Sequence, residues 1–149
     1  MESKREQSVK TFKNGYNCAQ SVLSVFAKDL GINKDTSLKL ASPFGSGIAR
    51  MQETCGAVIG ALMVIGLKYG KGETGTEEDK IKAYDLSNQF MTEFKKNYGT
   101  VCCRELLEGV NMNTPEGMAK IKELDWFQVR CAKYVQDAVS ITEKIVDKV

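Results

Sequence analysis

Residues 55–69 read CGAVIGALMVIGLKY, and this stretch decides the fold. Thr54 precedes it and is a residue type that caps helix starts, while Gly70 follows it and is a residue type that ends helices. Between them, residues 57–67 are apolar on every side of a helix, a pattern typical of a helix buried in the middle of a fold. The sequence therefore predicts a buried central helix over about Cys55–Tyr69, with Cys55 at its first position.

Helix-start and helix-stop residues recur along the rest of the chain, whereas no alternating strand pattern appears. Further helices are expected over residues 3–13, from Asn17 to about Gly31, from Asp35 or Thr36 to Ala41, from Thr76 to about Asn97, from Thr100 to Leu107 and from Asp125 to about Lys148, with one more helical turn opening at Thr114-Pro115. Asn17 with Gln20, and Asp125 with Gln128, match the capping-box pattern. We therefore expect an all-α fold, a single-domain bundle of about six or seven helices that covers residues 1–149.

The length and charge of the chain narrow the possible function classes. Its 149 residues suffice for one domain with a proper hydrophobic core. Lys and Arg number 21 against 19 Asp and Glu, and no basic stripe with interleaved aromatic residues appears, so nucleic acid is a poor candidate partner. The longest apolar run, residues 56–67, is too short to span a bilayer, and residues 1–6 form no hydrophobic signal region. We expect a soluble, cytoplasmic protein without membrane insertion.

The chain contains five cysteines and no histidine. Without imidazole, the usual general base and the commonest zinc ligand are missing, so transition-metal or redox chemistry must fall mainly to sulfur. In a reducing cytosol, cysteines favour metal binding or redox catalysis over a permanent disulfide framework. Cys18 and Cys55 are expected at helix starts, where backbone N–H groups and the helix dipole lower a thiol pKa from about 8.5 to roughly 3.5–7.5.

Helical phase separates the remaining cysteines. Cys102 is offset by about 100° from Cys103 and groups with Glu105. Cys103 instead shares one predicted helix face with Leu106, Leu107 and Val110. In the last helix, the apolar stripe consists of Phe127, Cys131, Tyr134, Val135 and Ala138. The sequence therefore predicts four inward cysteines from four separate helices, namely Cys18, Cys55, Cys103 and Cys131.

Simpler interpretations stay open for these residues. A free cysteine often serves as a small buried hydrophobe, and the chain has no Cys-x-x-Cys segment that would make a metal site specific. The loop Gly45-Ser46-Gly47 follows a helix and lacks the lysine of a phosphate-binding loop, so a plain turn is the first interpretation. Its glycines nevertheless let backbone N–H groups approach an anion such as thiolate or sulfide, and Gly56 clears space beside Cys55.

Segments along nearly the whole chain resemble a known family. They are GYNCAQSVL at residues 15–23, FGSG at 44–47, CGAVIGALM at 55–63, CRELL at 103–107 and the later Cys131. Together they are similar to the redox-active proteins named for the pattern C-GCAxxG-C-C. The same module resembles the iron–sulfur part of split-Soret cytochromes c, which implies a [2Fe-2S] cluster bound by Cys18, Cys55, Cys103 and Cys131. The chain lacks Cys-x-x-Cys-His, so attachment of a c-type haem does not carry over, and Cys102 is an additional cysteine.

The leading hypothesis is a redox-active protein whose four inward cysteines bind an iron–sulfur cluster for electron transfer or redox sensing, with N–H groups near sulfur supplied by Gly45, Gly47 and Gly56. The alternative is a metal-free thiol–disulfide oxidoreductase or redox sensor with Cys18 or Cys55 as the low-pKa nucleophile. A third hypothesis is a structural zinc site of four cysteines in an interaction module. The redox hypotheses require a redox partner protein that the sequence does not identify, and the apolar helices leave a homodimer open.

Overall fold

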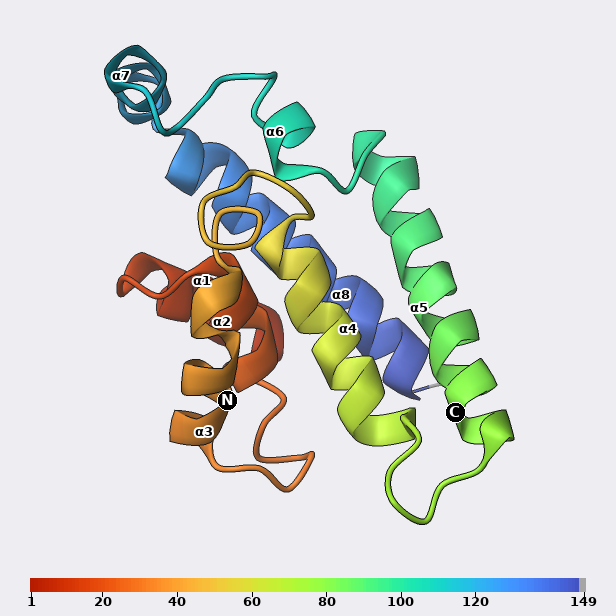
Figure 1. Ribbon diagram of the computed structural model, residues 1–149. Coiled ribbons are helices and arrows are strands. Elements are labelled where there is room, and N and C mark those ends of the chain that lie inside the picture. Colours follow the sequence, from red (N-terminus) through yellow and green to blue (C-terminus); the bar gives the residue numbers. More distant parts are fainter. Residues whose placement is uncertain (148–149) are drawn as a thin grey trace.

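The computed structural model of the chain is all-α and describes residues 1–147 (Figure 1). Its helices are α1 (Lys4–Lys13), α2 (Cys18–Ser24), α3 (Lys34–Ala41), α4 (Gly56–Tyr69), α5 (Glu77–Tyr98), α6 (Cys103–Leu106), α7 (Pro115–Glu123) and α8 (Ala132–Asp147). A 3₁₀ turn, η1 (Ser42–Phe44), follows α3, and a π-helical turn, η2 (Phe127–Cys131), precedes α8. The all-α prediction is confirmed. The described residues form eight α-helices rather than six or seven, because Thr114-Pro115 opens a full helix instead of a turn.

Helix α4 lies at the centre of the bundle, as its apolar sequence predicts. It packs against α2 on one side, α5 on the other, and α8 (Figure 1). Half of the residues of α4 are buried, and its C-terminal turn reaches the surface, where Leu67 is 41% exposed. Gly60 allows α2 to approach closely, because a Cβ at this position would lie 2.8 Å from the carbonyl oxygen of Ala19. Despite the apolar character of α4, no helix within residues 1–147 is long and apolar enough to cross a bilayer.

Several helix starts carry the predicted caps. The side-chain oxygen of Asn17 accepts the Gln20 N–H at 2.9 Å, and the Gln20 side chain accepts the Asn17 N–H at 2.9 Å. Thr76 caps α5 and Thr114 caps α7 through their side-chain oxygens. Such bonds satisfy N–H groups that the helix itself leaves free, and so fix where each helix begins. As a result, Cys18 occupies the first position of α2, as predicted.

The starts of α4 and α6 lie later than predicted. Cys55, not Thr54, occupies the N-cap position of α4, and Cys102, not Thr100, occupies that of α6. The cause is an isolated antiparallel bridge between Thr54 and Cys102, which keeps both segments extended up to that point. The predicted first helical position of Cys55 is therefore wrong by one residue.

The last helix also starts later than its predicted capping box. Asp125 has a left-handed φ of 54°, and its backbone oxygen rather than its side chain accepts the Gln128 N–H, at 3.1 Å. The chain then passes through η2 into α8, which packs against α1, α2, α4 and α5 (Figure 1). The predicted end near Lys148 lies outside the described residues. Helix α2 is shorter than expected. It ends at Ser24, and turns connect it to Gly31.

Candidate functional site

Four of the five cysteines line one cavity. Its volume is ≈ 110 Å³, and it lies where α2, α4 and α6 begin and η2 ends. The thiol-bearing residues are Cys18, Cys55, Cys103 and Cys131, each at most 8% exposed. The structure thus brings together all four cysteines that the sequence predicts to point inward, from four separate elements.

Apolar side chains form much of the remaining wall. They are Phe12, Leu106, Leu107, Met112, Phe127 and Tyr134. The hydroxyl of Tyr134 donates to the backbone oxygen of Leu106 at 3.0 Å, so the polar end of this side chain is already satisfied. A wall of this kind keeps water away from a bound group and strengthens the interactions of that group with nearby N–H groups.

A short strand-like pairing sets the directions of Cys55 and Cys103. The Cys55 N–H donates to the segment before α6 at 2.7 Å, and the Cys103 N–H donates to the segment before α4 at 2.6 Å. Between these bonds lies the bridge of Thr54 with Cys102. Because successive side chains of an extended segment point to opposite faces, Cys55 and Cys103 share the cavity face. Cys102 is half-buried, does not line the cavity, and donates its thiol to a backbone oxygen at 3.4 Å.

The predicted choice of Cys103 over Cys102 therefore agrees with the structure, but the physical reason differs. Helical phase was the basis of the prediction, whereas the extended pairing before α6 is what turns Cys102 away. Helix α6 itself is only four residues long. A short helix of this kind contributes little to orientation by itself, so the pairing with the segment before α4 carries most of it.

The loop before α4 winds in a left-handed turn. Ser46, Gly47, Ile48, Ala49 and Arg50 have φ values of 52°, 70°, 67°, 49° and 64°. A left-handed residue other than glycine costs about 1–2 kcal/mol, so contacts with the rest of the fold must hold this loop. Ser46 and Gly47 lie on the cavity wall. The loop is therefore more than the plain turn expected, and no residue pattern in it predicts a left-handed turn.

Gln52 braces this loop, and sequence reasoning missed it. Gln52 is 1% exposed and has a left-handed φ of 55°. Its amide nitrogen donates to the Val110 oxygen at 2.8 Å, and its amide oxygen accepts the Met112 N–H at 3.0 Å. The left-handed loop is thereby tied to the segment after α6, which supplies Met112 to the cavity wall. A lone glutamine has no spacing signal that distinguishes a buried brace from an exposed side chain.

Two of the three candidate glycines lie at the cavity. Gly47 and Gly56 line it, whereas Gly45 is not among the described lining residues and packs against the cap of α2. A Cβ at Gly56 would lie 3.2 Å from the Cβ of Cys18. This glycine therefore clears space beside Cys18. The expected contact of Gly45 with a bound sulfur has no counterpart in this arrangement.

Burial raises the pKa of two cavity thiols. The pKa values of Cys55 and Cys103 rise from the ordinary 9.0 to about 12, because desolvation disfavours the charged thiolate. The N–H groups of Ala57 and Val58, at the start of α4, lower the pKa of Cys55, but burial outweighs them. The predicted lowering of the pKa of Cys55 is therefore wrong for the free thiol.

Cys18 and Cys131 influence each other's ionisation. Sharing of a proton with Cys131, together with burial, raises the pKa of Cys18. The same interaction lowers the pKa of Cys131, burial opposes that lowering, and the positive charge of Arg130 adds to it. The low pKa predicted for Cys18 or Cys55 is therefore wrong for both free thiols.

The four cavity thiols surround an open volume and are not arranged around the position of a single metal ion. All five cysteines are free. Within residues 1–147, no group of three or more Cys, Asp or Glu side chains is arranged to hold a single metal ion as it stands. The four cavity thiols instead face a common volume of ≈ 110 Å³.

Comparison with known families agrees with this geometry. No curated protein and no solved structure matches the chain. A family model described as "Putative redox-active protein (C_GCAxxG_C_C)" matches residues 16–145, a span that contains the four cavity cysteines and the glycines beside them. The match supports a redox role. Because it covers most of the sequence, the chain belongs to the C_GCAxxG_C_C family of redox-active proteins.

Proposed function

We propose that the cavity thiols hold an iron–sulfur cluster, most simply [2Fe-2S], and that the protein serves electron transfer or redox sensing. The ligands would be Cys18, Cys55, Cys103 and Cys131. The observation that carries the proposal is the meeting of these four buried thiols at one cavity of ≈ 110 Å³. Cysteines that merely fill a core would have no reason to gather around a void, because packed interiors leave few cavities.

The size of the cavity suits a group of several atoms. A single water needs about 10–15 Å³ by this measure, so a volume of ≈ 110 Å³ exceeds what one ion among four thiolates requires. Four cysteine thiolates are the usual ligand set of a [2Fe-2S] cluster. The chain has no histidine, and no carboxylate is among the described lining residues, so cysteine sulfur is the only one of the usual metal ligands at this cavity.

The chain supplies the surroundings of the cluster. When bound, the cluster would supply one-electron redox chemistry. Ser46 and Gly47 bring loop backbone to the wall, where N–H groups can bond sulfur, and Gly56 does the same from the start of α4. Phe12 and Phe127 limit the access of water. N–H donors and an apolar wall are the two features by which a protein adjusts the potential of such a centre.

The same proposal implies a partner and a compartment. An electron carrier or sensor exchanges electrons with a separate redox partner protein. Buried free thiols persist in reducing surroundings, so we place the protein in the cytoplasm.

Anaerobic expression followed by iron and acid-labile sulfide analysis tests the cluster. We expect iron and sulfide in equal amounts and a visible absorbance that dithionite bleaches. Replacing Cys18, Cys55, Cys103 or Cys131 by serine should in each case lower the amount of bound iron. Cys102→Ser is the matched control and should retain the cluster, because Cys102 does not line the cavity. Zinc without iron would assign the structural zinc site instead, and neither metal after anaerobic reconstitution overturns the proposal.

Contact between Cys18 and Cys131 favours a second candidate, thiol–disulfide exchange. The two thiols would lose two electrons and two protons to a disulfide substrate, whose sulfurs become thiols as the Cys18–Cys131 bond forms. Mass spectrometry of the metal-free protein, after oxidation by a small disulfide, identifies the pairing. If oxidation forms no disulfide between Cys18 and Cys131, this second candidate is excluded. The cluster proposal is not affected by that result.

A further inference from the structure

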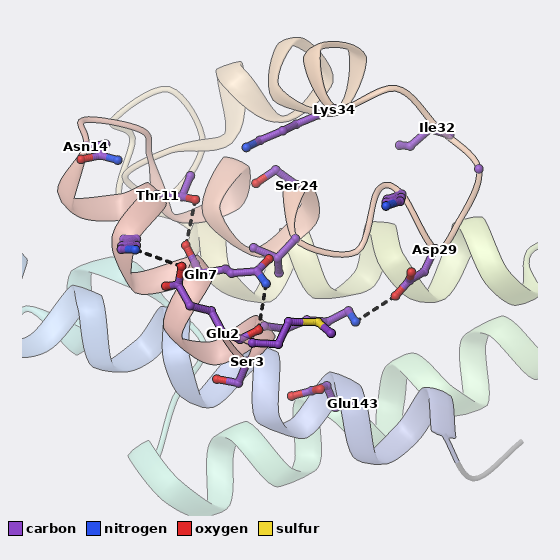
Figure 2. Close-up of a pocket in the computed structure, with 16 residues that line it drawn as sticks. Glu2, Ser3, Gln7, Thr11, Asn14, Ser24, Asp29, Ile32, Lys34 and Glu143 are labelled. Atoms are coloured by element: carbon purple, nitrogen blue, oxygen red, sulfur yellow. Dashed lines mark hydrogen bonds and ion pairs between the residues drawn. The ribbon is translucent and has the colours of Figure 1, made fainter.

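A large pocket lies between α1 and the segment that joins α2 to α3 (Figure 2). Its volume is ≈ 1100 Å³, comparable with the sites that hold small molecules, which span about 300–1,000 Å³. It shares no lining residue with the cysteine cavity. Anything that binds here is therefore separate from the proposed cluster.

Ser24, the last residue of α2, gives this pocket an unsatisfied polar group. The residue is 6% exposed, and its hydroxyl oxygen has no hydrogen-bond partner within residues 1–147. A buried hydroxyl without a partner destabilises a fold, whereas alanine at the same position would avoid that cost. Figure 2 shows the Ser24 hydroxyl directed to the same side of the pocket as the ammonium group of Lys34.

Positive charge in this pocket is only partly neutralised. Asp29 and Glu2 each already bond a lysine of α1, at 2.8 and 2.9 Å. Lys28 and Lys34 also line the pocket, and neither forms an ion pair with any residue from 1 to 147. The remaining acid, Glu143, comes from α8 and lies across the pocket from Lys34 (Figure 2). The end of the pocket near Ser24 therefore carries the unpaired positive charge of Lys34.

We propose that this end of the pocket binds a phosphate group, either free or as an ester, through Ser24, Lys34 and Asn14. Hydroxyl, ammonium and amide groups all donate hydrogen bonds, and Asn14 lines the pocket on the side toward which Ser24 and Lys34 point (Figure 2). If the Ser24 side chain turns toward the pocket, a phosphate oxygen would give its hydroxyl the acceptor that the protein does not provide. Because this hydroxyl lies at the buried wall, a compact anion suits it better than a bulky one.

Titration calorimetry of the full chain with inorganic phosphate at low ionic strength tests the proposal. Ser24→Ala and Lys34→Gln should each weaken phosphate binding about tenfold or more, the loss expected for one hydrogen bond or ion pair to a charged group. Lys39→Gln is the matched control, because Lys39 lies on the same helix, α3, but does not line the pocket. Its affinity for phosphate should equal that of the unmodified chain, and binding should weaken as salt is added.

Parallel measurements separate a ligand site from a structural role. Ser24→Ala should melt at the same temperature as the unmodified chain or higher, because it removes an unpaired hydroxyl. A lower melting temperature would assign the hydroxyl to the fold and overturn the proposal. So would the absence of saturable phosphate binding, an equal loss in Lys39→Gln, or tighter binding of citrate than of phosphate. Tighter binding of AMP than of inorganic phosphate would identify the ligand as a phosphate ester.

Discussion

Replacing Gly47 by alanine probes the contact between the left-handed loop and a cavity cysteine. A Cβ at this position would lie 2.6 Å from the Cα of Gln52 and from the backbone nitrogen of Glu53. It would also lie 2.7 Å from the Cβ of Cys103. Two of these neighbours are backbone atoms in a braced loop, so they cannot move aside as a flexible side chain does. Gly47→Ala should therefore displace the loop, Cys103 or both.

Two costs add in this variant. The left-handed φ of 70° costs alanine about 1–2 kcal/mol, and the overpacking costs about 1–3 kcal/mol. Together they lower the free energy of unfolding by about 2–5 kcal/mol. For a chain of this size, that change lowers the melting temperature by about 5–15 °C. Iron loading should fall as well, because Cys103 is a proposed ligand.

Gly31→Ala is the control for the backbone cost alone. Gly31 has a nearly equal φ of 73°, and no atom lies within 4 Å of the position its Cβ would take. Urea unfolding should therefore show a loss of only about 1–2 kcal/mol for Gly31→Ala, with normal iron loading. Equal losses for the two variants, with equal iron, would show that the close contact at Gly47 has no energetic weight and would refute the reasoning.

Other perturbations have equally definite outcomes. Gln52→Leu should lower the free energy of unfolding by about 2 kcal/mol or more, because it leaves the Val110 oxygen and the Met112 N–H buried without their partner; a urea midpoint within error of the unmodified chain would contradict this. Metal-free protein should lose stability as the pH rises from about 9 to about 12, because Cys55 and Cys103 keep their protons in the folded state while the unfolded thiols ionise. Thermal melts across that range check the slope, which should flatten in Cys55→Ser; an unchanged slope counts against the burial argument.

Local features of the fold could be predicted because local bonds create them. Asn17 with Gln20 forms a capping box that needs only residues three apart, and the structure contains both of its bonds. The apolar run after Gly56 identified the central helix because a helix with no polar face is expected to pack against neighbours on several sides. These local signals predict that Cys18 begins a helix and that Cys55 lies at or next to the start of the central helix.

Features that depend on distant segments could not be predicted. Thr54 is a good helix cap by residue type, yet it pairs with Cys102, so the cap prediction failed. The left-handed turn is held by Gln52, whose partners lie 58 and 60 residues further along the chain. The expected pKa values of Cys18 and Cys55 rested on helix ends alone; the interaction with Cys131 together with burial raises the pKa of Cys18 instead, and burial raises that of Cys55. Each error came from a contact between segments remote in sequence.

The π-helical turn η2 makes the direction of a thiol depend on chain length rather than on residue identity. A π-helical turn holds one residue more than an α-helical turn, and Cys131 is its last residue. Val129, within it, is 62% exposed, so many side chains fit there. Deleting one residue from this turn would rotate Cys131 by about 100° relative to the preceding chain, while leaving every side chain of α8 unchanged. Relatives with the same cavity should therefore vary in composition here but not in spacing.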